Sequence, residues 1–353
     1  MKVLVLGGTG AMGSHLCSLL EGVGAHVFIT SRSQLQSVGK IHYLQGNAKD
    51  DCFLTDILRE QWDVIVDFMV YDTKAFAQRV DRLLSSCGQY IFLSTSRVYA
   101  ESSSPITETS PRLLDACKDH EFLDTEEYAL TKARQEDILF NSIKKNWTII
   151  RPYITYGEER LQLGVLEKEG WMYRALRGRT IIFSSDIAER TTTLTYGLDV
   201  ANGIQSLIGN QKALGEAYHI TANDSLRWKD VLAIYLEMLE LHLGHEPGMR
   251  LLDLADFTEC HPAKYQIYYD RMYDRQFDNR KIEQFLNVAA FTRPEIGLRN
   301  CFRHFLQNPR FQNIDWKAEA MKDRKTGDRT PLAEISRLKS KFKYLLFRHM
   351  RLN

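Results

Sequence analysis

The N-terminal half of the chain alternates short apolar runs with amphipathic stretches. The runs are rich in Val, Ile and Leu without polar alternation, which is typical of strands covered on both faces. The pattern predicts strands over residues 2–6, 27–30, 41–44, 64–68, 90–94 and 147–151. It predicts helices over 11–23, 51–60 and 128–144. This alternation indicates βαβ units on a parallel sheet.

The rhythm changes after Pro152, where charged and aromatic segments separate shorter elements. Here the pattern predicts strands over 180–183, 192–195 and 218–221 and a helix over 228–241. No Gly/Ser-rich or Pro-rich linker divides the chain. We therefore expect a first domain over 1–152 and a smaller region over 153–310, some of whose segments return to the first sheet. A C-terminal extension over 311–353 follows.

Composition and charge are those of an ordinary globular protein. The 353 residues are 44% hydrophobic, and a formal net charge of +1 gives no electrostatic case for nucleic acid as the main partner. No apolar run approaches the roughly 20 residues that span a bilayer, and residues 1–6 lead into glycines without a signal-peptide cleavage site. Six dispersed cysteines indicate reduced thiols, so we expect a cytoplasmic protein without a metal site.

The C-terminal extension ends in a basic segment, residues 336–353, that holds no acidic residue. Its cations are Arg337, Lys339, Lys341, Lys343, Arg348 and Arg351. The residues that would share one helical face are Leu338, Phe342, Leu345 and His349. We expect this helix to pack on its own domain with the basic side outward. A weak contact with a membrane surface is the alternative.

A glycine-rich loop, residues 7–13, follows the first predicted strand and opens the first predicted helix. Such a loop uses one glycine for a tight turn, one for approach to a pyrophosphate and one for packing helix on strand. The pyrophosphate lies against free N–H groups at the positive end of the helix. This context predicts a dinucleotide-binding, Rossmann-type α/β fold with a doubly wound parallel sheet. The residues expected to contact the cofactor here are Gly7, Thr9, Gly10, Ala11, Met12 and Gly13.

The residues after the second and third strands bear on which dinucleotide binds. An acidic residue after the second strand would bind the adenosine ribose and indicate NAD, but this chain has Ser31 and Arg32 there. A serine and a guanidinium can receive a 2′-phosphate, which favours NADP, with NAD as the alternative. Asn47 and Ala48 lie where the adenine would rest, although Asn47 can also simply form a turn.

A tyrosine and a lysine lie four residues apart on one face of the predicted helix 128–144. The Tyr128 phenol titrates at about pH 10 when unperturbed. Lys132 and an oxidised nicotinamide would lower its pKa and allow proton exchange near neutrality. Upstream, Thr95 and Ser96 follow the strand 90–94, at the edge where a doubly wound sheet binds its ligands. Thr95 can hydrogen-bond a substrate oxygen.

Three motifs follow one another along the chain: the glycine loop, the strand end that carries hydroxyl groups and the YxxxK helix. With these motifs in this order, the chain resembles the extended short-chain dehydrogenase/reductase family. That family includes NAD(P)-dependent epimerases, dehydratases and reductases of nucleotide sugars. The resemblance runs from Met1 to roughly Leu306 and includes residues 147–152, 194–201 and 216–220. It implies the following roles: substrate-oxygen donor for Thr95, acid/base for Tyr128, ribose ligand for Lys132, cofactor contact for Tyr153, substrate contact for Ser96, and diphosphate contact for Arg190.

Two of the chain's departures from the family bear on its function. Residues 67–71 replace a stretch that is usually small and polar, so contacts to the cofactor's ribose should differ. In the sugar 4,6-dehydratases an Asp-Glu pair follows the threonine, whereas Ser96 and Arg97 stand there in this chain. The resemblance therefore disfavours the elimination of water.

The resemblance implies an enzyme that transfers hydride at a ring carbon of a nucleotide-diphosphate sugar. Ser31 and Arg32 favour a keto-sugar reductase with Tyr128 as proton donor, and a 4-epimerase with tightly bound NAD is the alternative. Reduction of a small carbonyl compound is disfavoured by the long second half. An alternative of another class is a non-catalytic, dinucleotide-sensing or RNA-associated protein, which would be expected to lose the tyrosine–lysine pair. The family also implies a homodimer, and its substrates suggest polysaccharide biosynthesis.

Overall fold

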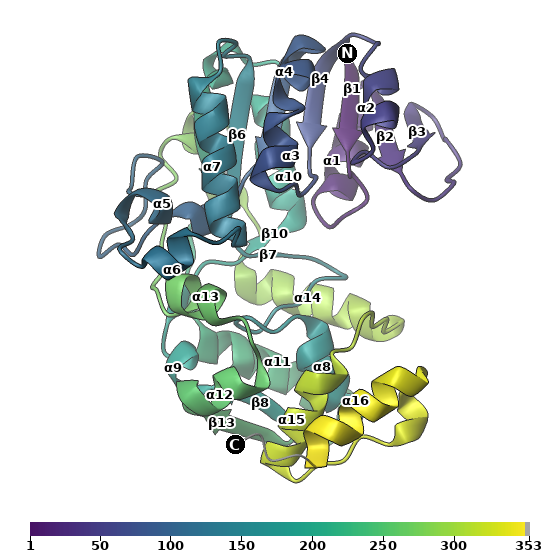
Figure 1. The fold of residues 1–353 in the computed structure, drawn as a ribbon, viewed down its shortest axis with the longest axis vertical. Coiled ribbons are helices and arrows are strands. Elements are labelled where there is room, and N and C mark those ends of the chain that lie inside the picture. Colours follow the sequence, from purple (N-terminus) through teal and green to yellow (C-terminus); the bar gives the residue numbers. More distant parts are fainter. Residues whose placement is uncertain (350–353) are drawn as a thin grey trace. The chain divides into compact units, whose positions relative to one another are not determined.

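The computed structural model describes residues 1–349 and forms two compact units. Unit 1 comprises Met1–Thr155, Thr193–Asp224 and Arg275–Pro294. Unit 2 comprises Tyr156–Thr192, Ser225–Asp274 and the chain from Glu295 onward. Neither unit is one continuous stretch of sequence, as the interleaved colours of Figure 1 show.

Unit 1 is built on a seven-stranded sheet of order β11-β6-β5-β4-β1-β2-β3, with every neighbouring pair parallel. The strands are β1 (Lys2–Leu6), β2 (His26–Ser31), β3 (Ile41–Gln45), β4 (Trp62–Asp67), β5 (Cys87–Leu93), β6 (Trp147–Pro152) and β11 (Glu216–Ile220). The chain runs outward from β1 to β3 and then returns to place β4 beside β1. The strand order therefore reverses between β1 and β4, which confirms the predicted doubly wound α/β fold.

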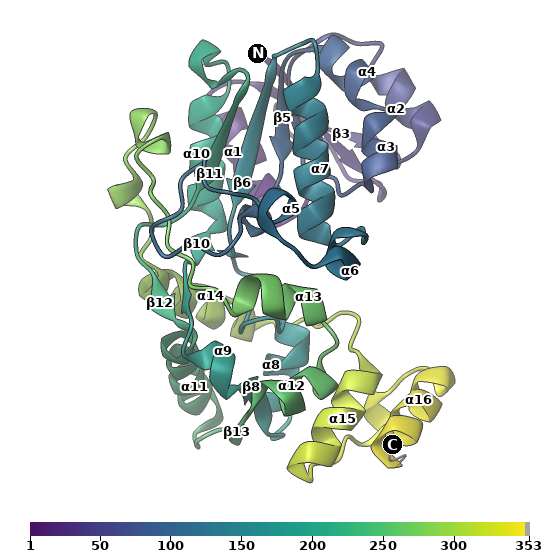
Figure 2. The same ribbon diagram turned by 60° about the vertical axis from the view of Figure 1, so that its left-hand side comes forward.

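Helices cover both faces of this sheet (Figure 2). They are α1 (Gly13–Gly22), α2 (Asp51–Ile57), α3 (Thr73–Ala77), α4 (Val80–Ser85), α7 (Tyr128–Asn141) and α10 (Gly197–Leu207). The short helices α5 (Leu113–Ala116) and α6 (His120–Leu123) contribute to neither of the two cores. Successive side chains of a strand point to opposite faces. Val3 and Val5 accordingly pack in one core with α1 and α10, whereas Leu4 and Leu6 pack in the other with α2, α4 and α7.

Local chemistry moves some element ends from their predicted positions. Helix α7 ends at Asn141 instead of 144, because the Ser142 hydroxyl donates to the carbonyls of Leu139 and Lys144 and turns the chain away. The strand predicted over 192–195 is two short strands, β9 (Thr191–Thr192) and β10 (Thr195–Tyr196). The intervening Thr193 hydroxyl donates to the carbonyl of Arg275 within unit 1.

Unit 2 has little sheet and many helices. Strand β8 (Ile181–Ser184) pairs in parallel with β13 (Met249–Leu252), and β9 pairs antiparallel with β12 (Leu226–Arg227). The helices are α8 (Met172–Ala175), α9 (Ser185–Ala188), α11 (Trp228–Leu243), α12 (Leu254–Cys260), α13 (Lys264–Gln266), α14 (Pro294–Gln307), α15 (Trp316–Thr326) and α16 (Leu338–His349). In its core the Trp171 ring stacks on Tyr235, with 4.5 Å between ring centroids.

The C-terminal helix α16 packs on α15 through a face that differs from the predicted one. Its buried residue is Tyr344. Of the predicted face, Leu345 is half-buried and packs beside this core, whereas Leu338 and Phe342 are exposed. The basic residue Arg351 lies outside the described residues. Within residues 1–349, no helix has both the length and the apolar character that crossing a bilayer requires.

Candidate active site

The loop after β1 has a backbone geometry that requires glycine. Gly7 has a φ of 74°, and its N–H donates to the Thr30 hydroxyl at 3.1 Å. A Cβ on Gly13 would lie 2.6 Å from the Gly8 carbonyl oxygen, so helix α1 can approach the loop only without a side chain there. A Cβ on Gly10 would meet nothing within 4 Å. The loop is thus tight at both ends and open in the middle.

Helix α1 points its N-terminus at this opening. The N–H groups of a first helical turn have no partner within the helix, and they carry the positive end of its dipole. Thr9 and Gly10 are exposed, and Ala11 and Met12 are half-buried. The loop therefore lies at the positive end of helix α1, as pyrophosphate-binding loops do.

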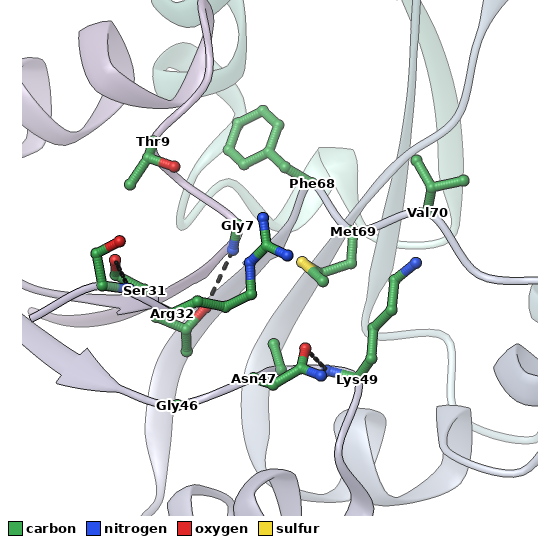
Figure 3. A pocket seen from close by; sticks show the side chains of 13 residues that line it. Gly7, Thr9, Ser31, Arg32, Gly46, Asn47, Lys49, Phe68, Met69 and Val70 are labelled. Carbon is green, nitrogen blue, oxygen red and sulfur yellow. Dashed lines mark hydrogen bonds between the residues drawn. The ribbon is translucent and has the colours of Figure 1, made fainter. Parts of the chain in front are cut away.

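A pocket of about 500 Å³ opens beside this loop, at the carboxyl ends of β1, β2, β3 and β4. It lies at the point where the strand order reverses, which is where doubly wound sheets bind ligands. Figure 3 shows its lining residues: Gly7, Thr9, Thr30, Ser31, Arg32, Ser33, Gly46, Asn47, Ala48, Lys49, Phe68, Met69 and Val70. Its position and lining fit the adenosine half of a dinucleotide, whereas Tyr128, Lys132 and Tyr153 are not among the lining residues.

Two of the residues that line the pocket, Arg32 and Lys49, are cations. None of its lining residues within 1–349 carries a carboxylate. The predicted contacts Ser31, Arg32, Asn47 and Ala48 all lie there. The Asn47 side-chain carbonyl accepts from the Lys49 N–H at 3.1 Å, so this side chain does form a turn. Its amide group remains able to donate.

Sequence reasoning missed several lining residues. Thr30 holds the Gly7 N–H, and Lys49 adds a second cation beside Asn47. The Met69 sulfur would lie 2.8 Å from a Cβ on Gly7, so this side chain covers the glycine loop. The departure of residues 67–71 from the family pattern could have predicted that Met69 contacts the pocket. The position of Lys49 directly after Asn47 and Ala48 could have predicted the second cation.

Tyr128 and Lys132 begin helix α7, which starts where the Glu127 carboxylate accepts the Ala129 N–H at 2.6 Å. Tyr128 is half-buried, whereas Lys132 is only 1% exposed. The Lys132 ammonium donates to the Leu93 carbonyl oxygen at 2.7 Å, at the carboxyl end of β5, and lies 4.4 Å from the Phe92 ring centre. Burial lowers the pKa of Lys132 to about 8, although Asp67 and Glu136 oppose that shift.

Two buried carboxylates accompany this lysine. Asp67, at the end of β4, accepts from the Tyr90 hydroxyl at 2.8 Å and from the Met69 N–H at 2.9 Å. Burial raises the pKa of Asp67 despite these donors. Glu136, one turn beyond Lys132, accepts from the Ser94 hydroxyl at 2.6 Å. Lys132 therefore lies in a low-dielectric site near carboxylates from two elements, of which Glu136 also pairs with the buried Arg151 at 2.8 Å.

The residues after β5 form the short turn η1 (Ser96–Val98), which packs on α7. The Thr95 hydroxyl begins this turn by accepting the Arg97 N–H at 3.2 Å. Ser96 is fully buried and donates to the Arg151 carbonyl at 2.7 Å. The Arg97 guanidinium lies 5.5 Å from the Tyr128 ring centre and pairs with Glu127. This arrangement places a hydroxyl and a cation at the start of α7.

Two predicted residues lie further from the glycine loop in sequence. Tyr153 follows β6 in unit 1; it is 5% exposed, and its ring centroid is 5.4 Å from that of Phe277. Arg190 belongs to unit 2, where it lines a surface hollow with Ser185, Asp186 and Glu189. Its Nε atom is buried without a hydrogen-bond partner.

The reversed sheet, the glycine loop and the tyrosine–lysine helix define a Rossmann-type fold, the class of fold that binds dinucleotides at this edge of the sheet. Residues 3–220 match the NAD dependent epimerase/dehydratase family. The chain belongs to this family, which confirms the resemblance found in its sequence.

Two curated relatives differ in the activities that their names state. The chain is 26% identical over 236 residues to the chloroplast stem-loop binding protein of 41 kDa b from Arabidopsis thaliana, covering 62% of this chain and 58% of that protein. It is 20% identical over 244 residues to the 2′-dehydrokanamycin reductase of Streptomyces kanamyceticus, covering 65% of this chain and 64% of that protein. The chain thus spans less than two thirds of the length of either relative.

Solved structures share the fold. The epimerase Mth375 of Methanothermobacter thermautotrophicus aligns with a TM-score of 0.67 and 17% identity, over 87% of this chain and 92% of that one. The UDP-glucuronic acid 4-epimerase of Bacillus cereus, in complex with NAD, aligns with a TM-score of 0.64 and 19% identity, over 87% and 99%. At these identities the similarity shows the fold alone.

Proposed function

We propose that this protein binds a nicotinamide dinucleotide and transfers hydride at a ring carbon of a nucleotide-linked sugar, with Tyr128 as proton donor. The observation that carries the proposal is that the glycine-loop pocket and the Tyr128–Lys132 pair lie in one unit, on one sheet. The loop, the pocket and the pair are the parts that such a reaction needs. We favour a keto-sugar reductase.

The residues around the pocket suit each part of the dinucleotide. The backbone of residues 10–13 would hold the pyrophosphate, and Asn47 with Ala48 the adenine. Lys132 would hold the nicotinamide ribose beside Tyr153. When bound, the nicotinamide supplies or accepts a hydride at C4.

Proton transfer would fall to residues of the chain itself. Tyr128 would donate its phenolic proton to the substrate oxygen, and Thr95 would hydrogen-bond the same oxygen. Lys132 and Arg97 are the cations that would stabilise the phenolate left behind. Ser96 would hold the turn beside the substrate in place, because its hydroxyl already donates to the Arg151 carbonyl.

NADP is the cofactor that we favour, because Ser31, Arg32 and Lys49 line the pocket without a carboxylate among its described lining residues. Arg190 would contact the diphosphate of the sugar nucleotide. A cytoplasmic homodimer would be consistent with the family. The choice of cofactor decides between the two reactions below.

A nucleotide-sugar 4-epimerase with tightly bound NAD is the second candidate, and the NAD complex of the Bacillus cereus 4-epimerase favours it. The test is to release and identify any nucleotide that copurifies with the protein, and to measure affinities for NAD(H) and NADP(H). An empty site that prefers NADPH would support the reductase. Stoichiometric, tightly held NAD would replace the reductase by the epimerase.

A third candidate belongs to another class, because one relative is named as a stem-loop binding protein. In that case binding of RNA, and not the chemistry of Tyr128, would be the function. Tyr128→Phe separates these readings: an enzyme loses turnover, whereas an RNA-binding protein keeps its affinity for stem-loop RNA and its biological function.

A further inference from the structure

Helix α16 exposes a row of apolar side chains on the face opposite its packed side. The row, here called the α16 stripe, consists of Leu338, Phe342 and Leu346, which are 70%, 66% and 49% exposed. Their spacing of four residues places them along one side of the helix. Tyr344, by contrast, is 2% exposed and points toward α15. At 100° per residue it lies about 200° around the helix from the centre of the stripe.

Cations flank the stripe. Lys339 and Lys343 lie along one side of it and Lys341 along the other, whereas Arg348 lies near Tyr344 and donates to the Asp328 carbonyl at 3.1 Å. The Lys343 ammonium lies 3.6 Å from the Asp315 carboxylate, and both side chains are about half exposed. Residues 335–349 contain no acidic side chain. The chain as a whole is nearly neutral, with a formal net charge of +1, so this helix is a local concentration of positive charge.

The helix is held firmly in unit 2, so the stripe is a surface of the folded protein. The Tyr344 hydroxyl donates to the Asp323 carboxylate of α15 at 2.8 Å. The other oxygen of Asp323 accepts from the fully buried Arg174 at 2.8 Å. Figure 2 shows α15 and α16 side by side at the C-terminal end of the chain.

We propose that the α16 stripe and its flanking cations dock unit 2 on an anionic lipid bilayer. A helix with an apolar face and lysines at its margins lies in the plane of a membrane interface, with apolar side chains among the acyl chains and ammonium groups at the headgroups. The charges favour anionic lipid over neutral lipid. Apolar side chains at the centre of a basic face favour a bilayer over nucleic acid, whose charged backbone offers the stripe little to bury against. Repulsion between two such basic faces disfavours a second copy of this chain.

The test is cosedimentation of the full chain with vesicles of phosphatidylcholine alone and of phosphatidylcholine mixed with phosphatidylglycerol. We expect binding to the anionic vesicles that weakens as salt increases. Leu338→Gln/Phe342→Gln/Leu346→Gln should weaken it by about tenfold or more. Lys339→Gln/Lys343→Gln should weaken it by about fivefold per lysine. Deletion of the helix is a poorer test, because it removes the buried Tyr344.

Matched controls are Leu241→Gln, an exposed leucine on α11 of the same unit, and Arg310→Gln, an exposed arginine outside α16. Both should bind vesicles as the parent does, and all variants should melt at the parent temperature. The tryptophan fluorescence of the Phe342→Trp variant should shift to shorter wavelength when anionic vesicles are added.

Three results would overturn the proposal. One is equal or absent binding to the two vesicle types, and another is an unshifted Phe342→Trp emission. The third is that vesicle binding is absent and the α16 stripe serves another partner. In that case the triple glutamine variant would abolish binding to stem-loop RNA, or would abolish a concentration-dependent increase in mass that indicates self-association.

Discussion

The Arg97 guanidinium lies 5.5 Å from the centre of the Tyr128 ring and pairs with the carboxylate of Glu127. Both charged side chains are largely shielded from solvent, with exposed fractions of 14% and 16%. Glu127 also caps α7 by accepting the Ala129 N–H. The proposed proton donor therefore has a positioned cation on its ring, a feature that the YxxxK motif does not specify.

Replacing this cation should impair the proposed reaction. Arg97→Gln should lower kcat by about tenfold, because a cation near the ring stabilises the phenolate. It should also move the alkaline limb of the pH–rate profile to higher pH. Arg97→Lys keeps the charge and should restore both properties in large part. If Arg97→Gln leaves the pH–rate profile unchanged, the guanidinium serves only to hold the Glu127 carboxylate in place.

Removing the phenolic hydroxyl should abolish most turnover without harming the fold. Tyr128→Phe should lower kcat by about 10²- to 10⁴-fold, the usual contribution of a positioned acid or base. Dinucleotide affinity should change little. Tyr268→Phe, at an exposed tyrosine of unit 2, is the matched control and should keep full activity. Turnover that survives in Tyr128→Phe would remove Tyr128 as proton donor.

Burial of Lys132 should make stability depend on pH. Its pKa is about 8 in the folded protein, below the ordinary value of 10.5, because burial disfavours the ammonium. The unfolded chain therefore binds more protons between about pH 8 and 10.5, and stability rises with pH across that window. Below pH 8 the full cost of the buried charge remains.

Lys132→Met should consequently increase the free energy of unfolding at neutral pH by up to about 3 kcal/mol and raise the melting temperature. The same substitution should abolish activity. The advantage should shrink as pH rises through 8 to 10.5. Thermal melts of both proteins across this range provide the measurement. A difference that does not vary with pH would mean that Lys132 keeps its ordinary pKa in the folded protein.

Two glycines of one loop should respond differently to alanine. Gly13→Ala should destabilise the fold by about 1–3 kcal/mol, because its Cβ would lie 2.6 Å from the Gly8 carbonyl oxygen. Gly10→Ala adds a methyl group in open space and should leave the melting temperature unchanged. It should nevertheless weaken dinucleotide binding, since the methyl would stand where the pyrophosphate approaches. Unimpaired binding by Gly10→Ala would place the dinucleotide elsewhere.

The exposed Arg32 should select between the two dinucleotides. Arg32→Ala should weaken NADPH binding by about tenfold and leave NADH binding unchanged, because only NADPH carries a 2′-phosphate. Arg310→Ala, an exposed arginine outside the pocket, is the control. Titrations monitored by cofactor fluorescence give both affinities. Equal losses for both cofactors would contradict a role for Arg32 in selection.

Much of unit 1 was predictable, because its signals are local. The apolar runs that became β1 to β6 and β11 are found within a few residues of their predicted places. The glycine spacing predicted a loop whose middle is open at Gly10 and closed at Gly13. Contacts across the sheet were not predictable in this way. Met69 over Gly7, for example, joins two residues that follow strands β4 and β1, which become neighbours only when β4 returns beside β1.

The sequence by itself determined the doubly wound sheet, the glycine loop and the order of the hydroxyl and YxxxK motifs, because periodicity and glycine requirements act over a few neighbouring residues. Tertiary structure alone decided the environments of the side chains. It buried Lys132 near Asp67 and Glu136, and it turned Tyr344 rather than Phe342 toward α15. Helix α16 has apolar residues on more than one face, so only the position of its neighbour, with a carboxylate for the Tyr344 hydroxyl, could select which face is packed.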